Sequence, residues 1–462
     1  MDFPIFHLDF FGDRLLIAIV AILHVLINHA MAVGGIPLVL YLELHGSRQN
    51  DPLRRQAFDE LARRLMFMFF LITTTIGALT GVGIWFTTAV VNPAAIGSLI
   101  RVFYWAWFAE WLVFVSEVVL ILAYYLTWER WGSARKREHL RLGLALAIMS
   151  WVTMALITAI LGFMMDPGDW LKTPSFLSGI LNPLYLPQLA FRTPLAMVLA
   201  GVLVAALIPF FTRDSEIRLQ ALRLTGRWTC WWLVPTAVAG SWYLSAVPRS
   251  FYANLGTALG GMAHAGDQAI LVAFLGGCLA VVVWSVFTLW WAPRHTPRWG
   301  VLLAVVAAII LTASFERTRE FLRKPWIIGG YMYANGYRMV DYPLLNREGV
   351  LPHSAYAEIG SVTAGNRVQA GAAVFQLTCA KCHTVEGVNS VLDRFTALYG
   401  REPWHADTVV TYLGTMQNAR SFMPPFPGNH SEREALAAWL IEQQRWKRPP
   451  VAAVVARQEG GN

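Results

Sequence analysis

The sequence predicts an all-α protein, in which an eight-helix transmembrane bundle is followed by a small α-helical domain. Two observations predict this fold class. The 462 residues are 56% hydrophobic and only 14% charged, with a positive mean hydropathy, and this composition excludes a soluble protein for most of the length. The apolar residues lie in long runs before about position 322. Open strands would leave backbone groups unpaired in lipid, so each run is expected to be a helix.

Eight apolar segments are long enough to cross about 30 Å of hydrocarbon as helices. We place them near positions 15–42, 62–90, 103–127, 141–165, 188–211, 228–247, 269–291 and 299–321. Arginines are abundant in the odd-numbered connecting loops, but the second, fourth and sixth loops carry only Arg101, Lys172 and Arg249. The positive-inside rule therefore predicts cytoplasmic odd-numbered loops and both termini outside. Because this topology accounts for the formal charge of +8, we expect a lipid membrane and no nucleic acid as partner.

The N-terminal segment does not show the pattern of a cleavable signal peptide. Its first fourteen residues carry Asp2, Asp9 and Asp13 against a single Arg14, whereas a signal peptide begins with a positively charged region. We therefore expect the first apolar segment to be retained as a membrane anchor.

The polar part of the chain contains the run Cys379-Ala380-Lys381-Cys382-His383, which is typical of a c-type haem attachment site. Two thiols one helical turn apart can add to the two vinyl groups of a haem, and the adjacent histidine then faces the iron. Met423, in a proline-stiffened loop, offers a ligand for the opposite face. A zinc knuckle or a redox pair is the alternative, but zinc would require a second pair of such ligands. Cys230 and Cys278 lie in apolar segments, where packing roles are expected.

Two helices are expected to flank this motif. The first, around 366–379, has Gly371 and Phe375 four residues apart, so a small and an aromatic residue share one face. The last, around 431–445, opens with Ser431 three residues before Glu434, which is the pattern of a capping box.

Helix, motif, methionine loop and closing helix together resemble a small class I cytochrome c. The resemblance implies that Cys379 and Cys382 hold one haem c covalently, with His383 and Met423 as its axial ligands. The predicted organisation is a transmembrane haem domain, a linker, a cytochrome c domain and a disordered tail, at residues 1–321, 322–364, 365–446 and 447–462.

Several ionisable residues lie inside the predicted membrane helices, where they are costly and therefore candidates for function. His24, Glu110 and Glu117 fall in the outer half of the bundle, and Glu320 lies at the outer end of the eighth helix. Imidazole suits iron and buried carboxylates can relay protons, which suggests haem ligation with a proton path. Alternatively, His24 is a hydrogen-bonded packing residue, and Glu320 is an interfacial partner of a neighbouring arginine or lysine.

Three stretches resemble subunit I of the cytochrome bd-type quinol oxidases. They are the run from Ala21 to Leu26, the helix containing Glu110 and Glu117, and the run Glu320-Phe321-Leu322-Arg323-Lys324-Pro325-Trp326. The resemblance implies that His24 and Glu320 serve the iron of a membrane haem, and that Glu110 and Glu117 take part in haem and proton handling. It implies one or two haems b, or haem d, and a second membrane subunit.

The chain also departs from that family. Arg192 stands where the family has the histidine of its low-spin haem, and the loop at about 248–268 is too short for the family's quinol-binding loop. The appended haem c could replace this electron entrance. His264 and Met262 could ligate a further haem, contact quinol, or simply lie in an interfacial loop.

The leading hypothesis is a multihaem cytochrome of the bacterial inner membrane, with both termini and the haem c domain in the periplasm. Haem c would accept electrons from a periplasmic redox partner, such as a soluble cytochrome, and pass them to a membrane haem site that reduces oxygen to water. The alternative is an electron-transfer subunit that links the quinone pool or a partner complex to a periplasmic redox partner without oxygen chemistry. A third hypothesis is a subunit whose membrane part docks a catalytic partner.

Overall fold

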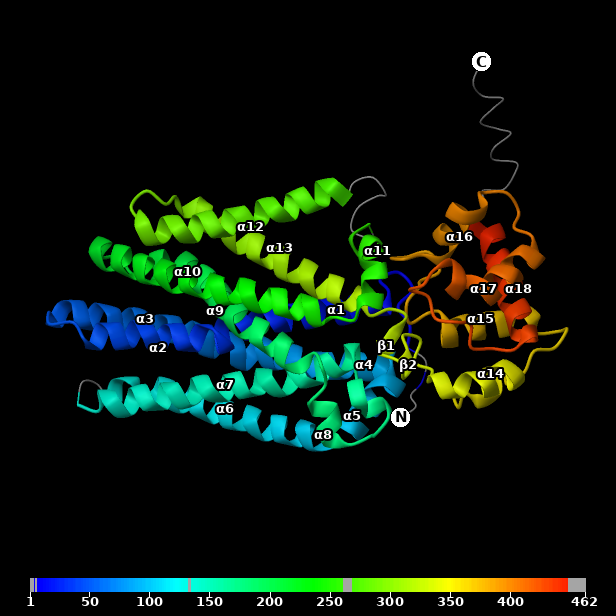
Figure 1. Cartoon of the computed structure of the whole chain (residues 1–462), viewed down its shortest axis with the longest axis horizontal. Helices are drawn as coiled ribbons and strands as arrows, with labels where there is room; N and C mark the ends of the chain where they lie inside the picture. The colour runs from blue at the N-terminus through cyan, green and yellow to red at the C-terminus, as the bar shows by residue number, and fades with distance from the viewer. Residues whose placement is uncertain (1–3, 5, 132–133, 261–267, 448–462) are drawn as a thin grey trace, which may run out of the picture. The chain divides into compact units, whose positions relative to one another are not determined.

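The computed structural model describes residues 4, 6–131, 134–260 and 268–447, and these residues are mainly helical (Figure 1). The all-α prediction is confirmed. Among the described residues the one sheet is a two-stranded antiparallel hairpin of β1 (Trp326–Ile328) and β2 (Met332–Tyr333). Met262, His264 and the predicted tail beyond residue 447 lie outside the described residues.

The helical elements follow one another along the whole described chain. The α-helices are α1 (Asp13–Ile27), α2 (Gly35–Ser47), α3 (Pro52–Ile72), α4 (Ala78–Val91), α5 (Pro93–Val102), α6 (Tyr104–Trp131), α7 (Lys136–Met165), α8 (Phe176–Ile180), α9 (Tyr185–Phe211), α10 (Ser215–Ala246), α11 (Leu255–Gly260), α12 (Gln268–Trp291), α13 (Arg298–Leu322), α14 (Tyr342–Glu348), α15 (Arg367–Thr378), α16 (Val391–Tyr399), α17 (Ala406–Ala419) and α18 (His430–Lys447). Two π-helical segments, η1 (Asn28–Val33) and η2 (Thr73–Gly77), join α1 to α2 and α3 to α4. Short 3-10 segments are η3 (Gly168–Leu171), η4 (Arg249–Asn254), η5 (Met339–Asp341) and η6 (Leu351–His353).

Seven helical segments of the described chain are long and apolar enough to cross a membrane. They are Asp13–Ser47, Pro52–Val91, Tyr104–Trp131, Lys136–Met165, Tyr185–Phe211, Gln268–Trp291 and Arg298–Leu322. Each coincides, to within one residue at its ends, with or encloses one of the predicted segments. The remaining prediction, 228–247, corresponds to the second half of α10 and ends one residue beyond it. This part of α10 is less apolar because it contains four tryptophans, whose indole N–H groups are polar, together with serines and threonines.

The chain divides into two compact units. One unit comprises Ile19–Trp85 and Leu99–Arg323, and the other comprises Met1–Ala18, Phe86–Ser98 and Lys324–Asn462. Three separate stretches of sequence therefore make up the unit that contains the haem attachment motif. The first stretch includes the start of α1, the second includes the end of α4 and the start of α5, and the third follows α13.

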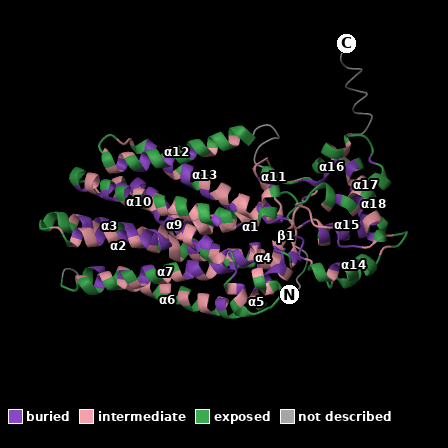
Figure 2. Ribbon diagram, in the orientation of Figure 1, coloured by how far each residue is buried: buried purple, intermediate pink, exposed green. Residues whose placement is uncertain are grey.

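In the first of these units, α2, α3, α6, α7, α9, α10, α12 and α13 run side by side (Figure 1). Buried residues line the faces that these helices turn toward one another, and exposed residues cover their outward faces (Figure 2). The outward residues are largely apolar: Trp105, Phe108 and Trp111 of α6 are 65%, 48% and 56% exposed. Apolar surface of this kind is what a lipid-facing helix presents.

A buried polar cluster joins α2, α6 and α7. The Glu43 carboxylate is fully buried, and it accepts hydrogen bonds from Nδ1 of His139 at 2.6 Å, from Nζ of Lys136 at 2.6 Å and from the Tyr124 hydroxyl. Asp59 of α3 also pairs with Lys136. A buried carboxylate is tolerated when charged and polar partners satisfy its oxygens, as they do here.

In the other unit, α15 packs closely on α18. A Cβ atom on Gly371 would lie 2.1 Å from the carbonyl oxygen of Ala435, so only glycine permits this approach. The rings of Phe375 and Trp439 are 4.7 Å apart. The prediction that Gly371 and Phe375 share one face is confirmed.

The predicted cap of the last helix is wrong. α18 begins at His430, and the side chain of Asn429 accepts the backbone N–H of Glu432 at 2.9 Å. The Ser431 hydroxyl instead donates to Asn429. Asn429 lies three residues before the N–H that it satisfies, and asparagine is as good an N-cap as serine.

Candidate haem sites

The attachment motif begins where α15 ends. Cys379 is the C-cap of α15, and its carbonyl oxygen accepts the N–H groups of Cys382 at 3.0 Å and His383 at 2.9 Å. The chain therefore makes a turn that keeps the two thiols together. Both cysteines are free, and burial raises the pKa of Cys379 to about 11. Two free thiols at this spacing fit the addition to haem vinyl groups.

The His383 imidazole is held through one nitrogen. Its Nδ1 lies 3.2 Å from the carbonyl oxygen of Asn389, which leaves Nε2 for a metal. Asn389 adopts a left-handed conformation, with φ of 64°, and its side chain donates to the carbonyl oxygen of Cys382 at 2.6 Å. Burial lowers the pKa of His383 to about 4, so the imidazole is neutral at pH 7, as iron coordination requires.

The Met423 loop borders the same hydrophobic core as Cys379. The N–H of Met423 donates to the carbonyl oxygen of Arg420 at 2.8 Å, and Phe426 is buried. Tyr342 of α14 donates its hydroxyl to the carbonyl oxygen of Pro425 at 3.1 Å. The loop is thus attached to the segment that was predicted to be a linker.

Two other segments of this unit contact the attachment motif and the loop after it. Nζ of Lys381 donates to the carbonyl oxygen of Asn335 at 2.7 Å, beside the β1–β2 hairpin. In the N-terminal segment, the Asp9 carboxylate accepts the N–H of Val385 at 2.5 Å, and the carbonyl oxygen of Phe10 accepts that of Val388 at 3.2 Å. The motif region is therefore held in part by the N-terminal segment, although Asp9 and Val385 are 376 residues apart in the sequence.

His24 lies on α1 against α4. Its Nδ1 is 3.1 Å from the carbonyl oxygen of Gly77 and 3.2 Å from the Thr80 hydroxyl, and its Nε2 has no hydrogen-bond partner among the described residues. A metal-bound histidine usually donates its second ring N–H to a carbonyl or carboxylate in this way. A Cβ atom on Gly81 would lie 3.2 Å from Cε1 of His24, so α4 packs closely on the ring. The residues around His24 fit a haem-ligating histidine.

The two carboxylates of α6 lie two turns apart on one face. Glu117 accepts hydrogen bonds from the hydroxyl of Ser150 at 2.5 Å and from that of Thr153 at 3.2 Å, both on α7. Glu110 is half-buried. The structure thus directs Glu117 toward α7, while His24 bonds to α4.

Glu320 and Arg323 form an ion pair at the end of α13. Oε2 of Glu320 accepts from Nε of Arg323 at 2.9 Å and from its NH2 group at 2.5 Å. One turn earlier, Glu316 is buried and lies 2.6 Å from the Arg192 guanidinium and 2.9 Å from Nε of Arg319. Arg192 is therefore occupied by a carboxylate, and a guanidinium has no free lone pair with which to bind iron.

Sequence reasoning missed Glu316, Glu43 and Gln188. Each stands inside an apolar stretch, which is the signal that could have found it, since polar residues in such stretches are costly. Glu316 was also missed because Glu320, four residues later on the same helix, begins the run that resembles the bd-type oxidases.

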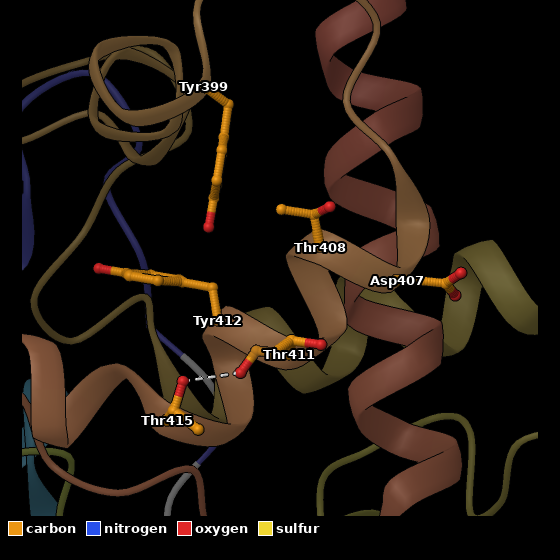
Figure 3. A pocket seen from close by; sticks show the side chains of 6 residues that line it. All are labelled: Tyr399, Asp407, Thr408, Thr411, Tyr412 and Thr415. Carbon is orange, nitrogen blue, oxygen red and sulfur yellow. Dashed lines mark hydrogen bonds between the residues drawn. The ribbon is translucent and has the colours of Figure 1, made fainter.

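A shallow depression of about 420 Å³ lies on the surface of the unit that contains the motif (Figure 3). Its lining includes Tyr399, Tyr412 and three threonines of α17, with the Thr415 hydroxyl bonded within the helix to Thr411. It contains none of the predicted site residues, so it is not part of the haem sites.

Comparisons with known proteins give two matches, one to a family and one to a solved structure. Residues 366–440 match the family described as Cytochrome C oxidase, cbb3-type, subunit III. A comparison with curated proteins gives no match. Among solved structures, a chain of the bd oxidase from Geobacillus thermodenitrificans is similar, with a TM-score of 0.56 and 20% sequence identity over 71% of this chain and 90% of that chain. At this identity the likeness shows the fold alone.

These findings define the class of protein: a helical, multi-pass membrane protein with an attached cytochrome c domain. The membrane part has the fold seen in a bd oxidase chain, so the predicted fusion is confirmed. A cytochrome c domain implies a covalently bound haem c, and the combination supports a haem-containing electron-transfer protein of a respiratory membrane.

Proposed function

We propose that this protein reduces oxygen to water at a membrane haem that receives its electrons from haem c. One observation supports this most directly. The imidazoles of His24 and His383 make the same kind of contact. In each, Nδ1 lies within hydrogen-bond distance of a backbone carbonyl oxygen, which leaves Nε2 available for a metal. The second histidine belongs to a haem attachment motif, so the first, half-buried between apolar helices, is best explained as a haem ligand as well.

In the haem c domain, Cys379 and Cys382 hold the haem through thioethers, and His383 and Met423 bind its iron. Arg420 and Tyr342 hold the backbone of the methionine loop from two sides. A loop restrained in this way keeps the sulfur in place, because little ordering remains to be done when it binds.

In the membrane domain, His24 would be an iron ligand and Glu320 would help to hold the same haem. A haem with an open iron position supplies oxygen binding and electron delivery when it is bound. Reduction of one oxygen molecule to two waters consumes four electrons and four protons, so the site needs proton donors. Glu117, oriented by Ser150 and Thr153, and Glu110 two turns along α6 are those donors.

The orientation follows from the loops. Arginine-rich loops between the apolar segments lie in the cytoplasm, and both termini with the haem c domain lie in the periplasm of a bacterial inner membrane. A soluble periplasmic redox protein is the electron donor, and lipid covers the apolar faces of the bundle. A second membrane subunit would pack on the same faces.

Replacement of His24 by alanine tests this function. The purified wild-type protein should show haem c and a second haem type in its pyridine-haemochrome spectrum, and the reduced form should bind carbon monoxide at the membrane haem. His24→Ala should lose that signal and oxygen consumption while it retains haem c. His45→Ala is the matched control, because this histidine lies on the same apolar span but bonds to Gln49.

Two results would contradict the proposal. If the wild-type protein contains a membrane haem that does not bind carbon monoxide, the electron-conduit alternative explains it better. If His24→Ala keeps its full haem content, His24 is a packing residue and the membrane part serves to dock a partner.

A further inference from the structure

A group of five polar residues, four of them buried, lies between η1, α9 and α13, and we call it the Arg192 cluster. Its members are His29, Gln188, Arg192, Glu316 and Arg319. The Arg192 guanidinium contacts Nε2 of His29 at 3.3 Å and Glu316 at 2.6 Å, and Glu316 also binds Arg319. Gln188 precedes Arg192 by four residues on α9 and so shares its face. All five side chains come from membrane-spanning segments.

The cluster is buried but incompletely hydrogen-bonded. Arg192 is 2% exposed, His29 is 4% and Gln188 is 0%. Nevertheless, Nε of Arg192, the NH1 group of Arg319 and both amide atoms of Gln188 have no hydrogen-bond partner among the described residues. Buried polar atoms are nearly always satisfied, because leaving one unpaired costs about 1–3 kcal/mol. So many unused groups in one place indicate that a bound group satisfies them.

The charge of the cluster indicates what that group is. Two guanidinium groups face the single carboxylate of Glu316. The neighbouring Glu320 is already paired with Arg323. A buried excess positive charge is costly in a membrane unless an anion compensates it. Guanidinium groups bind carboxylates through paired, charge-assisted hydrogen bonds, for which Arg192 and Arg319 both retain a free N–H.

We propose that the Arg192 cluster binds a propionate carboxylate of the membrane haem. A haem is the carboxylate-bearing apolar group that the site already requires, so this inference rests on the proposed function. A neutral carbonyl ligand such as a quinone would use the free N–H groups but would leave the positive charge uncompensated. Arg192 thus binds the edge of the haem, and it is not an iron ligand.

Three variants of the full-length protein, purified in detergent, test the proposal. In Arg192→Gln the midpoint potential of the membrane haem should fall, because removal of a nearby positive charge stabilises the oxidised iron. In Glu316→Gln it should rise. In Gln188→Leu the potential should stay near that of the wild type, but the propionate vibrations in resonance Raman spectra should shift. Arg227→Gln is the control, since Arg227 bonds at the exposed surface to Tyr41.

The double variant Arg192→Gln/Glu316→Gln separates propionate binding from simple ion pairing. Its net charge equals that of the wild type, so the potential should return toward the wild-type value while the propionate vibrations remain altered. If the potential and the vibrations both return to wild type, Arg192 serves only Glu316 and the proposal is overturned. It is also overturned if Gln188→Leu and Arg192→Gln leave the vibrations unchanged in protein that has its membrane haem. A wild-type protein without any membrane haem would instead refute the proposed function itself.

Discussion

The haem c attachment motif and the Arg192 cluster are assembled in opposite ways. Cys379, Cys382 and His383 lie within five consecutive residues, and one turn after α15 brings them together. Arg192 and Glu316 are 124 residues apart, and only the packing of α9 against α13 brings them into contact. Substitutions in the local motif should therefore abolish haem attachment but leave the fold intact. Substitutions in a cluster built from distant helices should change both the chemistry of the site and the stability of the fold.

The largest effect is expected in the local motif. The double variant Cys379→Ala/Cys382→Ala should lose covalent haem completely, because no thiol remains to form a thioether, while the membrane haem and the helical fold are retained. Haem staining after denaturing electrophoresis, with a pyridine-haemochrome spectrum of the native protein, measures both. Cys278→Ala, at a buried cysteine of α12, should keep its covalent haem. Covalent haem in the double variant would show that the motif has been misassigned.

The second prediction concerns the stability of the Arg192 cluster. Glu316→Gln leaves a buried guanidinium without its carboxylate and should destabilise the protein by about 3–5 kcal/mol. Glu434→Gln removes a carboxylate from an exposed pair with Arg367 and should cost at most about 1 kcal/mol. Thermal unfolding in detergent micelles compares the two variants. Equal stabilities would mean that the buried pair is no stronger than a surface pair.

The third prediction concerns the methionine loop. This loop is held both by a local hydrogen bond, from Met423 to Arg420, and by a distant one, from Tyr342 to Pro425. Tyr342→Phe removes the hydrogen bond to Pro425 and leaves that carbonyl and the Asn335 amide without this partner, at a cost of about 1 kcal/mol. The methionine-to-iron charge-transfer band of oxidised haem c should weaken, and reduced haem c should bind more carbon monoxide. Tyr412→Phe, in the shallow depression, is the matched control and should leave both properties unchanged.

The smallest effect is a pH dependence of the N-terminal contact. The hydrogen bond from His7 to Asp13 raises the pKa of His7 above its usual 6.5, with further support from Asp9. Protonated His7 therefore stabilises the folded segment. This contribution is complete below pH 6.5 and is lost as the pH rises through the raised pKa.

Hydrogen exchange at Val385 and Val388, whose N–H groups bond to Asp9 and Phe10, should accordingly accelerate as the pH rises through this range, after correction for the intrinsic rate. In His7→Phe the corrected exchange should no longer depend on pH. A persistent dependence would assign it to a different group.

Much of the fold could be predicted from the sequence because the signals are local. A long apolar run requires a helix in lipid wherever it occurs, and seven of the eight predicted segments accordingly lie on helices that are long and apolar enough to cross a membrane. The Cys-x-x-Cys-His motif likewise needs only its own five residues. Gly371 and Phe375 could be assigned to one face because helical periodicity is fixed.

The partners of buried polar residues could not be predicted, because they depend on how distant helices pack. The π-helical segments η1 and η2 have no sequence signal that we used, yet η1 contains His29 and the carbonyl oxygen of Gly77, the last residue of η2, bonds to His24. The sequence alone marked Arg192 as a departure from a family pattern, but only the tertiary structure paired it with Glu316. The physical reason is that an ion pair buried in a membrane is set by three-dimensional proximity, and neither composition nor periodicity encodes which helices will be neighbours.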